Sequence, residues 1–264
     1  MMAPGDAAEG LADRVCVLAG GSGGIGSRLA DLLHGEGAPL VLGYRRERER
    51  AEALAAELGR AGTAPVTLVG GDLAEERTRS DLIEAAGALG VPYGLVVLAG
   101  DPARPRGSVA TQSEMEASLR TNYLGPVLLA RAFAEKVAAA RTGGSVVLLS
   151  TMQALAPFEG SLSYAVPKAA LTHAALVLAK EWGGANDVRV NVVAPGVTAA
   201  GMAEASIHAG KYDRFVAGGV VRRFGRAEDV VRAIRFFLEP DCYVTGQVLA
   251  VDGGLVLRRD LLGR

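Results

Sequence analysis

Short apolar runs alternate with longer amphipathic stretches along almost the whole chain, and this alternation constrains the fold more than any other feature of the sequence. It predicts parallel strands joined by crossover helices. The runs lack polar residues at every second position, as expected of strands that are buried on both faces. The predicted strands are 15–19, 40–43, 66–69, 95–98, 145–149, 188–193 and 248–251. The predicted helices lie near 25–35, 47–60, 75–89, 113–141, 161–182 and 227–238.

These elements predict one α/β domain, in which a doubly wound, seven-stranded parallel sheet carries helices on both faces. A chain of 264 residues is long enough for two domains, but α/β proteins of this size commonly form one. Half of the residues are apolar, which suffices for a sizeable core, and no repeat or linker divides the chain. We expect a flexible leader over 1–13, a domain over 14–264 and a substrate lid in the irregular stretch of about 195–224.

Composition excludes several other classes of protein. The formal net charge of −1 gives no sign of nucleic-acid binding. The first 13 residues lack the basic and apolar regions of a secretory signal, and no unbroken run of 18 apolar residues suggests a membrane span. The two cysteines, Cys16 and Cys242, support neither a disulfide framework nor a zinc site. We therefore expect a soluble cytoplasmic protein without a metal.

A glycine-rich turn, GGSGGIG at 20–26, joins the first predicted strand to the first helix. Glycines let the backbone turn tightly and approach a pyrophosphate, whose charge the helix N-terminus favours. Many strand–helix turns carry glycines for packing alone, so the turn by itself is a weak signal. The strand–turn–helix context favours the Rossmann-type dinucleotide site. The predicted contacts in this turn are Gly20, Ser22, Gly24, Ile25 and Gly26.

The end of the second predicted strand bears on the choice of cofactor. Tyr44, Arg45 and Arg46 stand there, with no acidic residue at the strand end. An acidic side chain at this place usually binds a free ribose 2′-hydroxyl, whereas arginine suits a 2′-phosphate. The sequence therefore favours NADPH over NADH. The other interpretation is that the run RRERER at 45–50 is the solvated start of a helix.

Asp72 follows the third predicted strand and has two interpretations. Its carboxylate could bind the adenine amino group of a dinucleotide, because it stands at the carboxyl end of a strand. It could equally cap the helix that starts near residue 74. The two roles are compatible.

Tyr164 and Lys168 are four residues apart in a predicted helix, so their side chains share one face. A nearby ammonium favours the phenolate and is expected to lower the pKa of Tyr164 towards the working pH, so that the tyrosine can act as a proton donor. Thr151 lies 13 residues earlier and could hold a carbonyl oxygen in line with the phenol. Asn122 could connect Lys168 to solvent through water. Alone, a Tyr-x-x-x-Lys pair is more often a packing feature.

In these motifs the chain resembles the short-chain dehydrogenase/reductase family, and within it the 3-oxoacyl-carrier-protein reductase branch. The resemblance covers nearly all of 14–254. It rests on GGSGGIG (20–26), GDL (71–73), AG (99–100), Asn122, YAVPK (164–168), NVVAPG (191–196), RFGRAEDV (223–230) and VTGQVLAVDGG (244–254). The order and spacing of these motifs together are far more specific than any one of them.

The resemblance implies a set of site residues. The catalytic set would be Asn122, Thr151, Tyr164 and Lys168, and Lys168 would also bind the nicotinamide ribose. The other implied cofactor contacts are Asp72, Leu73, Ala99 and Gly100, with Pro195, Gly196, Val197 and Thr198 flanking the nicotinamide. Members of the family are usually tetramers that bury the two long helices, here 113–141 and 161–182, so a homotetramer or homodimer is expected.

Four positions depart from the family pattern. The usual serine is Thr151, which keeps the hydroxyl but restricts its rotamers; Ser150 is adjacent, yet the 13-residue spacing favours Thr151. Val97 and Leu98 replace two asparagines, and Ala19 replaces a threonine at the glycine turn. Ala200 stands where a threonine usually meets the carboxamide, and Thr198 could substitute from a shifted position. The departures suggest a specialised member rather than the housekeeping fatty-acid enzyme.

The leading hypothesis is an NADPH-dependent ketoreductase that reduces the β-keto group of an acyl thioester, in fatty-acid or polyketide-type biosynthesis. Arg141, Arg222 and Arg223 could meet an acidic carrier protein near the mouth of the site, or they could be ordinary surface charge.

Two alternatives remain open. The first is a dehydrogenase of a free sugar, steroid or small alcohol, for which the lid would decide the substrate. Its apolar residues Met202, Ile207, Tyr212 and Phe215 weakly suggest an apolar one. The second is an NADP(H)-sensing protein without turnover, although a sensor has no need of the proton donor Tyr164.

Overall fold

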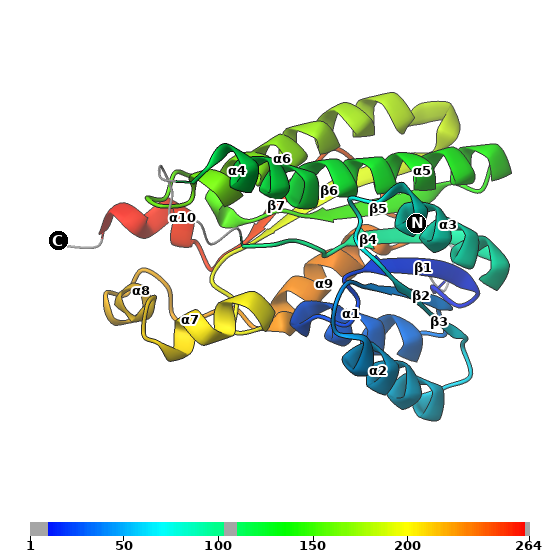
Figure 1. The fold of residues 1–264 in the computed structure, drawn as a ribbon, viewed down its shortest axis with the longest axis horizontal. Helices are drawn as coiled ribbons and strands as arrows, with labels where there is room; N and C mark the ends of the chain where they lie inside the picture. Colours follow the sequence, from blue (N-terminus) through cyan, green and yellow to red (C-terminus); the bar gives the residue numbers. More distant parts are fainter. Residues whose placement is uncertain (1–9, 103–109, 262–264) are drawn as a thin grey trace, which may run out of the picture.

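Seven parallel strands form one sheet within residues 10–102 and 110–261, which are the residues that the computed structural model describes (Figure 1). The strand order is β3-β2-β1-β4-β5-β6-β7. This doubly wound sheet confirms the predicted fold class. The strands are β1 (Arg14–Ala19), β2 (Leu40–Tyr44), β3 (Val66–Gly70), β4 (Val91–Val97), β5 (Gly144–Leu149), β6 (Val188–Pro195) and β7 (Val248–Val251).

Helices cover both faces of the sheet (Figure 1). On one face lie α3 (Glu76–Leu89), α4 (Gln112–Leu119), α5 (Gly125–Ala140) and α6 (Leu162–Trp182). On the other lie α1 (Gly24–Gly35), α2 (Arg48–Ala61) and α9 (Ala227–Leu238). The remaining short helices are α7 (Glu204–His208) and α8 (Asp213–Ala217) in the lid and α10 (Leu255–Arg258) near the C-terminus.

Two apolar cores, one on each face, follow from the alternation of side chains along each strand. In β1, Val15 and Val17 enter the core under α3, α5 and α6, whereas Cys16 and Leu18 enter the core over α1, α2 and α9. Because both faces are buried, the strand carries no polar face. The same packing begins before β1, because Leu11 is fully buried. The predicted boundary of the flexible leader at residue 13 is therefore too late in the sequence. Residues 1–9 of the predicted leader lie outside the described residues.

The predicted helix 113–141 is divided by a π-helix, Arg120–Leu124, between α4 and α5. The amide N–H of Gly125 bonds to the carbonyl of Arg120, five residues back. Pro126 has no N–H to donate to the carbonyl of residue 122, which disfavours an ordinary α-helical turn at this place. The interruption brings the side chain of Asn122 fully inside the protein.

Helix α6 has 21 residues, and an 18-residue window within it has a mean hydropathy of 1.3, so it meets the length and composition of a membrane span. Its packing indicates a core helix instead. Leu171 and Ala175 are fully buried against the sheet, and Lys168, one turn before Leu171 on the same helix, is buried too. The helix therefore positions part of the site described below.

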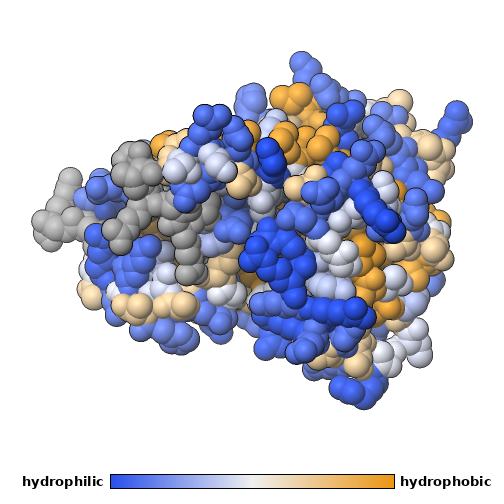
Figure 2. All heavy atoms as spheres, viewed as in Figure 1, coloured by the Kyte–Doolittle hydropathy of each residue, from blue (hydrophilic) through white to orange (hydrophobic). Residues whose placement is uncertain are grey.

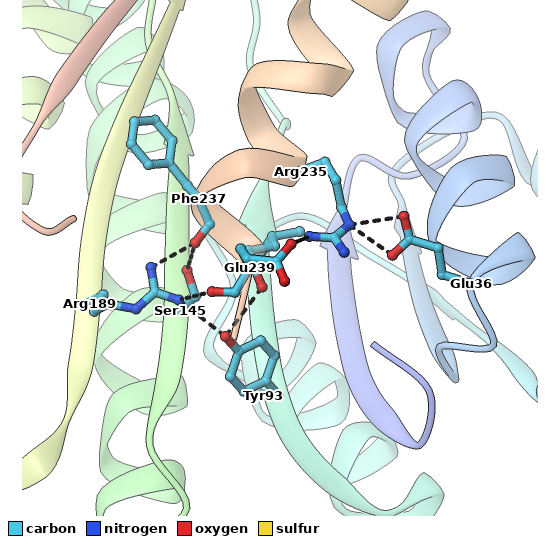
Figure 3. A network of polar contacts seen from close by, with 8 residues as sticks. Glu36, Tyr93, Ser145, Arg189, Arg235, Phe237 and Glu239 are labelled. Atoms are coloured by element: carbon cyan, nitrogen blue, oxygen red, sulfur yellow. Dashed lines mark hydrogen bonds and ion pairs between the residues drawn. The ribbon is translucent and has the colours of Figure 1, made fainter. Parts of the chain in front are cut away.

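A polar network holds the C-terminal end of α9 at the amino-terminal edge of the sheet (Figure 3). Helix ends leave carbonyls without intrahelical partners, and here side chains from the starts of β4, β5 and β6 satisfy them. The guanidinium of Arg189 donates to the carbonyls of Phe237 (2.8 Å) and Glu239 (2.9 Å). Ser145 Oγ donates to Phe237, Tyr93 Oη donates to Leu238, and Arg235 bridges Glu36 and Glu239. This network fixes the amino ends of the strands, and the carboxyl ends of the strands lie on the opposite side of the sheet.

Candidate active site

A cleft of about 1220 Å³ lies along the carboxyl ends of the strands, where ligands bind in open α/β sheets. The ends of β1, β2, β3, β4, β5 and β6 all reach it. Most of the residues predicted from the sequence line it. They are Gly20, Ser22, Gly24, Ile25, Gly26, Tyr44, Arg45, Arg46, Asp72, Leu73, Ala99, Gly100, Thr151, Tyr164, Pro195, Gly196, Val197 and Thr198. Asn122 and Lys168 are buried behind its wall.

The glycine-rich turn has the features of a phosphate cradle. Gly20 adopts φ of 92°, and a β-carbon there would lie 2.9 Å from the backbone nitrogen of Ala99. Helix α1 begins at Gly24, its N-cap Gly23 makes no side-chain cap, and no acidic residue stands in its first turn. The first N–H groups of this helix therefore face the cleft side of the turn without a side-chain acceptor, as a pyrophosphate requires. A dinucleotide fits these residues.

Backbone bonds hold this region together where the family pattern has polar side chains. The carbonyl of Ala19 accepts from the N–H groups of both Leu98 and Ala99, each at 2.9 Å. The carbonyl of Gly43 likewise accepts from Gly20 (2.9 Å) and Gly21 (3.1 Å). The apolar Val97 and Leu98 side chains are buried. The ends of β1, β2 and β4 thus remain joined without the missing amide and hydroxyl.

Arg45, at the end of β2, is held between two carboxylates. Its Nη1 lies 3.5 Å from Asp72 Oδ2, and its Nη2 lies 3.3 Å from Asp101 Oδ2. Asp101 was not predicted from the sequence, because nothing local marks a residue from the loop after β4 as a partner of a residue at the end of β2. The solvated interpretation of the basic run applies to Arg48, which pairs with Glu52 on the same helix, and to Arg50, which pairs with the N-cap residue Glu47.

Asp72 closes the turn that precedes α3. Its Oδ1 accepts from the N–H of Ala74 at 2.9 Å, and its carbonyl accepts from Glu75. Helix α3 begins at Glu76 with Glu75 at its N-cap, so Asp72 does not cap it. The predicted helix start near residue 74 was therefore slightly early. Asp72 Oδ2 faces Arg45, and the adenine contact stays a prediction.

Tyr164 lines the cleft from the first turns of α6, and Thr151 lines it beside the Tyr164 hydroxyl, close enough to act on its pKa. Burial raises the pKa of Tyr164 to about 12; the Thr151 hydroxyl acts to lower this pKa, and the charge of Asp101 acts to raise it. The expectation that a neighbouring ammonium lowers this pKa is wrong for the cofactor-free protein, because desolvation of the phenolate dominates. Tyr164 is therefore a protonated phenol at neutral pH.

Lys168 is almost completely buried beneath the cleft. Its Nζ donates to the carbonyl of Leu149 at 2.8 Å, at the end of β5. A β-carbon on Gly100 would lie 3.3 Å from this Nζ, so the ammonium stands directly behind the wall that Gly100 forms. Burial lowers the pKa of Lys168 to about 8, because the ammonium loses its hydration.

Asn122 braces the loop after β4 from within the π-helix. Its Oδ1 accepts from the N–H of Asp101 at 3.0 Å, and its Nδ2 donates to the Asp101 carbonyl at 2.9 Å and to Ser118 Oγ at 3.0 Å. The side-chain amide thus fixes the backbone that carries the Asp101 carboxylate. The relay from Lys168 to solvent stays a prediction.

The adjacent hydroxyls of Ser150 and Thr151 have different partners. Ser150 Oγ bonds to the carbonyl of Lys168 (3.1 Å) and to Thr172 Oγ1 (2.7 Å), which ties β5 to α6. Thr151 Oγ1 instead accepts from Gln153 N, and its hydroxyl lies close enough to the Tyr164 phenol to lower the pKa of that phenol. This division of partners supports Thr151 as the reactive hydroxyl.

The lid forms a small core of its own. Phe215 is buried and packs with Val220 and Val221, and Ile207 packs against the same cluster. The expectation that Ile207 and Phe215 face a substrate is therefore wrong, whereas Met202 and Tyr212 do line the cleft. The polar side chains of Gln153, Glu159, Ser161, Ser206 and Lys211 line it too. The buried Thr198 bonds to the Gly196 carbonyl, and Ala200 also reaches the cleft.

The three arginines proposed for a carrier protein are not grouped at the mouth of the site. Arg141 is the C-cap of α5, just before β5 begins, so it stands at the opposite edge of the sheet and its predicted place is wrong. Arg223 binds Asp229 through both nitrogens, at 2.6 and 3.0 Å, and holds the pKa of that carboxyl down at about 2. Arg222 lies beside it next to α8. Surface and structural roles account for these residues.

No group of three or more His, Cys, Asp or Glu side chains is placed to hold a metal ion within 10–102 and 110–261. The site instead combines a phosphate cradle with a tyrosine, a buried lysine and a hydroxyl at one end of the same cleft. These are the parts of a nicotinamide-dependent oxidoreductase that acts on a carbonyl or a hydroxyl group.

Comparison with known proteins identifies the family. Residues 19–256 match the family described as Enoyl-(Acyl carrier protein) reductase. The chain belongs to the short-chain dehydrogenase/reductase family, whose fold binds NAD(H) or NADP(H). It is therefore an oxidoreductase of carbonyl and hydroxyl groups.

Relatives and solved structures agree with this assignment. A 3-oxoacyl-[acyl-carrier-protein] reductase of Rattus norvegicus is 36% identical over 93% of this chain and 99% of its own. An acetoacetyl-CoA reductase of Synechocystis is 31% identical over 92% and 97%. The solved structure of a short-chain type dehydrogenase/reductase from Mycobacterium ulcerans has a TM-score of 0.87 at 27% identity, over 94% of this chain and 91% of that one.

Proposed function

We propose that the protein is an NADPH-dependent ketoreductase that reduces the β-keto group of an acyl thioester to a hydroxyl, in fatty-acid or polyketide-type biosynthesis. The observation that carries the proposal is the protonated, partly buried Tyr164, which lines the cleft together with Thr151, whose hydroxyl acts on its pKa. The choice of a thioester substrate is supported by the names of two relatives, a 3-oxoacyl-[acyl-carrier-protein] reductase and an acetoacetyl-CoA reductase.

The cofactor preference rests on the end of β2. Arg45 and Arg46 line the cleft there, and both can meet a 2′-phosphate. The nicotinamide cofactor supplies a hydride to the carbonyl carbon when it is bound. Leu73, Ala99 and the segment from Pro195 to Thr198 line the same cleft and are proposed to hold its two ends.

The residues of the chain manage the proton. As the carbonyl oxygen gains negative charge, the O–H bond of Tyr164 breaks and its proton passes to that oxygen, which leaves a phenolate on Tyr164. The Thr151 hydroxyl orients the phenol and the carbonyl oxygen towards each other. With a pKa of about 8, Lys168 is mostly an ammonium at neutral pH, and its charge stabilises the phenolate until solvent returns a proton.

We also propose a homotetramer or homodimer that works in the cytoplasm. Helix α6 exposes Leu162, Val166 and Val177, which are 47%, 53% and 42% accessible in the single chain. Figure 2 shows apolar groups among the charged ones at the upper edge of the view, where α5 and α6 lie. A second copy would bury these side chains.

The test is NADPH consumption with acetoacetyl thioesters of coenzyme A and of a carrier protein, beside NADH and a Tyr164→Phe variant. We expect turnover with NADPH that the variant loses. Turnover only with free sugars, steroids or small alcohols would overturn the proposal that the substrate is a thioester. Tight NADPH binding without turnover on any carbonyl would favour a sensor.

A further inference from the structure

The ion pair between Arg45 and Asp101 crosses the mouth of the cofactor cleft. Arg45 follows β2, whereas Asp101 follows β4, and β1 lies between these two strands in the sheet. The guanidinium therefore reaches over the end of β1, above the glycine turn. Its other nitrogen faces Asp72, after β3, on the opposite side. One arginine thus connects three strand ends around the place where a dinucleotide would enter.

The Asp101 carboxylate is held in this position by the buried Asn122. Both the N–H and the carbonyl of Asp101 bond to the side-chain amide of Asn122. Asp101 follows Gly100, which lines the cleft, and its charge also acts on Tyr164 at the reacting end. Because its backbone is anchored, Asp101 cannot easily follow Arg45 if the guanidinium moves.

We propose that Asp101 is a specificity-determining residue that competes with the 2′-phosphate of the cofactor for Arg45. To bind that phosphate, the guanidinium has to give up one of its two carboxylates, and the phosphate then lies near the remaining negative charges. A free ribose hydroxyl meets no such repulsion and can donate to a carboxylate. Asp101 therefore narrows the preference for NADPH over NADH that Arg45 creates.

This inference rests on the proposed NADPH preference and deepens it. Arg45 is about one third exposed, so solvent screens the pair and the effect is modest. Ion pairs of this kind contribute about 0.2–1 kcal/mol, which corresponds to a change of up to about fivefold in a binding ratio. We expect Asp101→Asn to raise the ratio of the NADH to the NADPH dissociation constant by about two- to fivefold.

The experiment titrates the wild-type protein and its variants with NADPH and NADH and follows the nicotinamide fluorescence on binding. Asp81→Asn is the matched control, because it removes one exposed carboxylate of α3 that pairs with Arg77 rather than Arg45. The expected ratio is unchanged in Asp81→Asn. In an Arg45→Gln background, adding Asp101→Asn should change the ratio by clearly less than it does alone, because the competition for the guanidinium is then absent.

Three results would overturn the inference: an unchanged ratio in Asp101→Asn, a shift towards NADH, or an effect that persists fully in the Arg45→Gln background. These outcomes are separable from failure of the proposed function. If the wild-type protein binds both cofactors and the ratio responds as expected, but no thioester is reduced, the substrate proposal fails and the role of Asp101 stands. Wild-type protein that binds only NADH would refute the NADPH preference itself.

Discussion

Gly24 of the phosphate turn and Gly201 of the lid are in direct backbone contact: a β-carbon on Gly24 would lie 2.6 Å from the nitrogen of Gly201. Gly201 has φ of 56°, a left-handed conformation that suits glycine. The first turn of the lid therefore rests on the first residue of α1. Any side chain at Gly24 has to push one of these two segments away from the other.

Gly24→Ala is predicted to displace the start of the lid and weaken NADPH binding. Overpacking of this kind costs about 1–3 kcal/mol, so the dissociation constant should rise by roughly tenfold. Limited proteolysis of 201–217 should also become faster. Gly59→Ala in α2 is the control, because no atom lies within 4 Å of its β-carbon, and it should stabilise the fold by about 0.5–1 kcal/mol. Equal proteolysis of Gly24→Ala and wild type would contradict the lid contact.

Tyr164→Phe is predicted to lower kcat by about 10²–10⁴-fold without a comparable loss of NADPH affinity, because it removes the proton donor and keeps the ring. Steady-state kinetics and a binding titration on the same preparations measure both quantities. Retention of more than a tenth of the activity would show that another group supplies the proton.

Two substitutions at Thr151 separate its hydroxyl from its methyl group. Thr151→Ser keeps the hydroxyl and should retain kcat within a few-fold. Thr151→Val removes the hydroxyl that acts on Tyr164 and should lower kcat by about 10²-fold. Ser150→Ala, by contrast, should mainly cost about 1 kcal/mol of stability, because its bonds join β5 to α6. Equal loss of kcat in Thr151→Val and Ser150→Ala would contradict the division of roles.

Lys168 is predicted to make the fold less stable at neutral than at alkaline pH. Its pKa is 10.5 when unperturbed and about 8 in the folded protein, so between these values the unfolded chain binds more protons. Stability therefore rises with pH over this window, by about 3 kcal/mol in total, and is lower below pH 8.

The Lys168→Met variant has no buried ammonium, so comparing its stability with that of wild type measures the cost of burying this charge. In urea unfolding at pH 7.5 the variant should exceed wild type by up to about 3 kcal/mol, and at pH 10 the gap should shrink to about 1 kcal/mol. Loss of the Leu149 contact lowers both variant values alike, so the change of the gap with pH is the decisive quantity. A gap that does not depend on pH would show that Lys168 is not desolvated.

The strands could be predicted almost to the residue, because a strand buried on both faces is an uninterrupted apolar run. β4 is the exception: it begins at Val91, where Pro92 and Gly94 conceal its first half in the sequence. The cleft could be predicted as well, since parallel strands bring their carboxyl ends together. The partners of the charged groups in the cleft could not be predicted, because Asp101 and Arg45 come together only when β2 and β4 lie on either side of β1.

Two other differences have their cause in burial. The pKa of Tyr164 depends on how much water reaches the phenol, which the four-residue spacing to Lys168 does not reveal. Ile207 and Phe215 were predicted to contact the substrate because they are apolar residues in an irregular stretch. That stretch, however, buries them in a small apolar cluster that holds its shape. Pro126 was a visible signal for the π-helix that the helical pattern alone concealed.

The π-helix makes this part of the chain more sensitive to its length than to its composition. Deleting one residue from Arg120–Leu124 would restore an ordinary helical turn with α4 and α5 still in phase, but it would remove the widened turn that carries Asn122 inside the protein. Ser118, which bonds to the carbonyl of Ser163 on α6, would keep its direction, whereas the brace that Asn122 gives to Asp101 would be lost. In an alignment, a gap here would therefore signal a rearranged active-site wall, even where every neighbouring letter is identical.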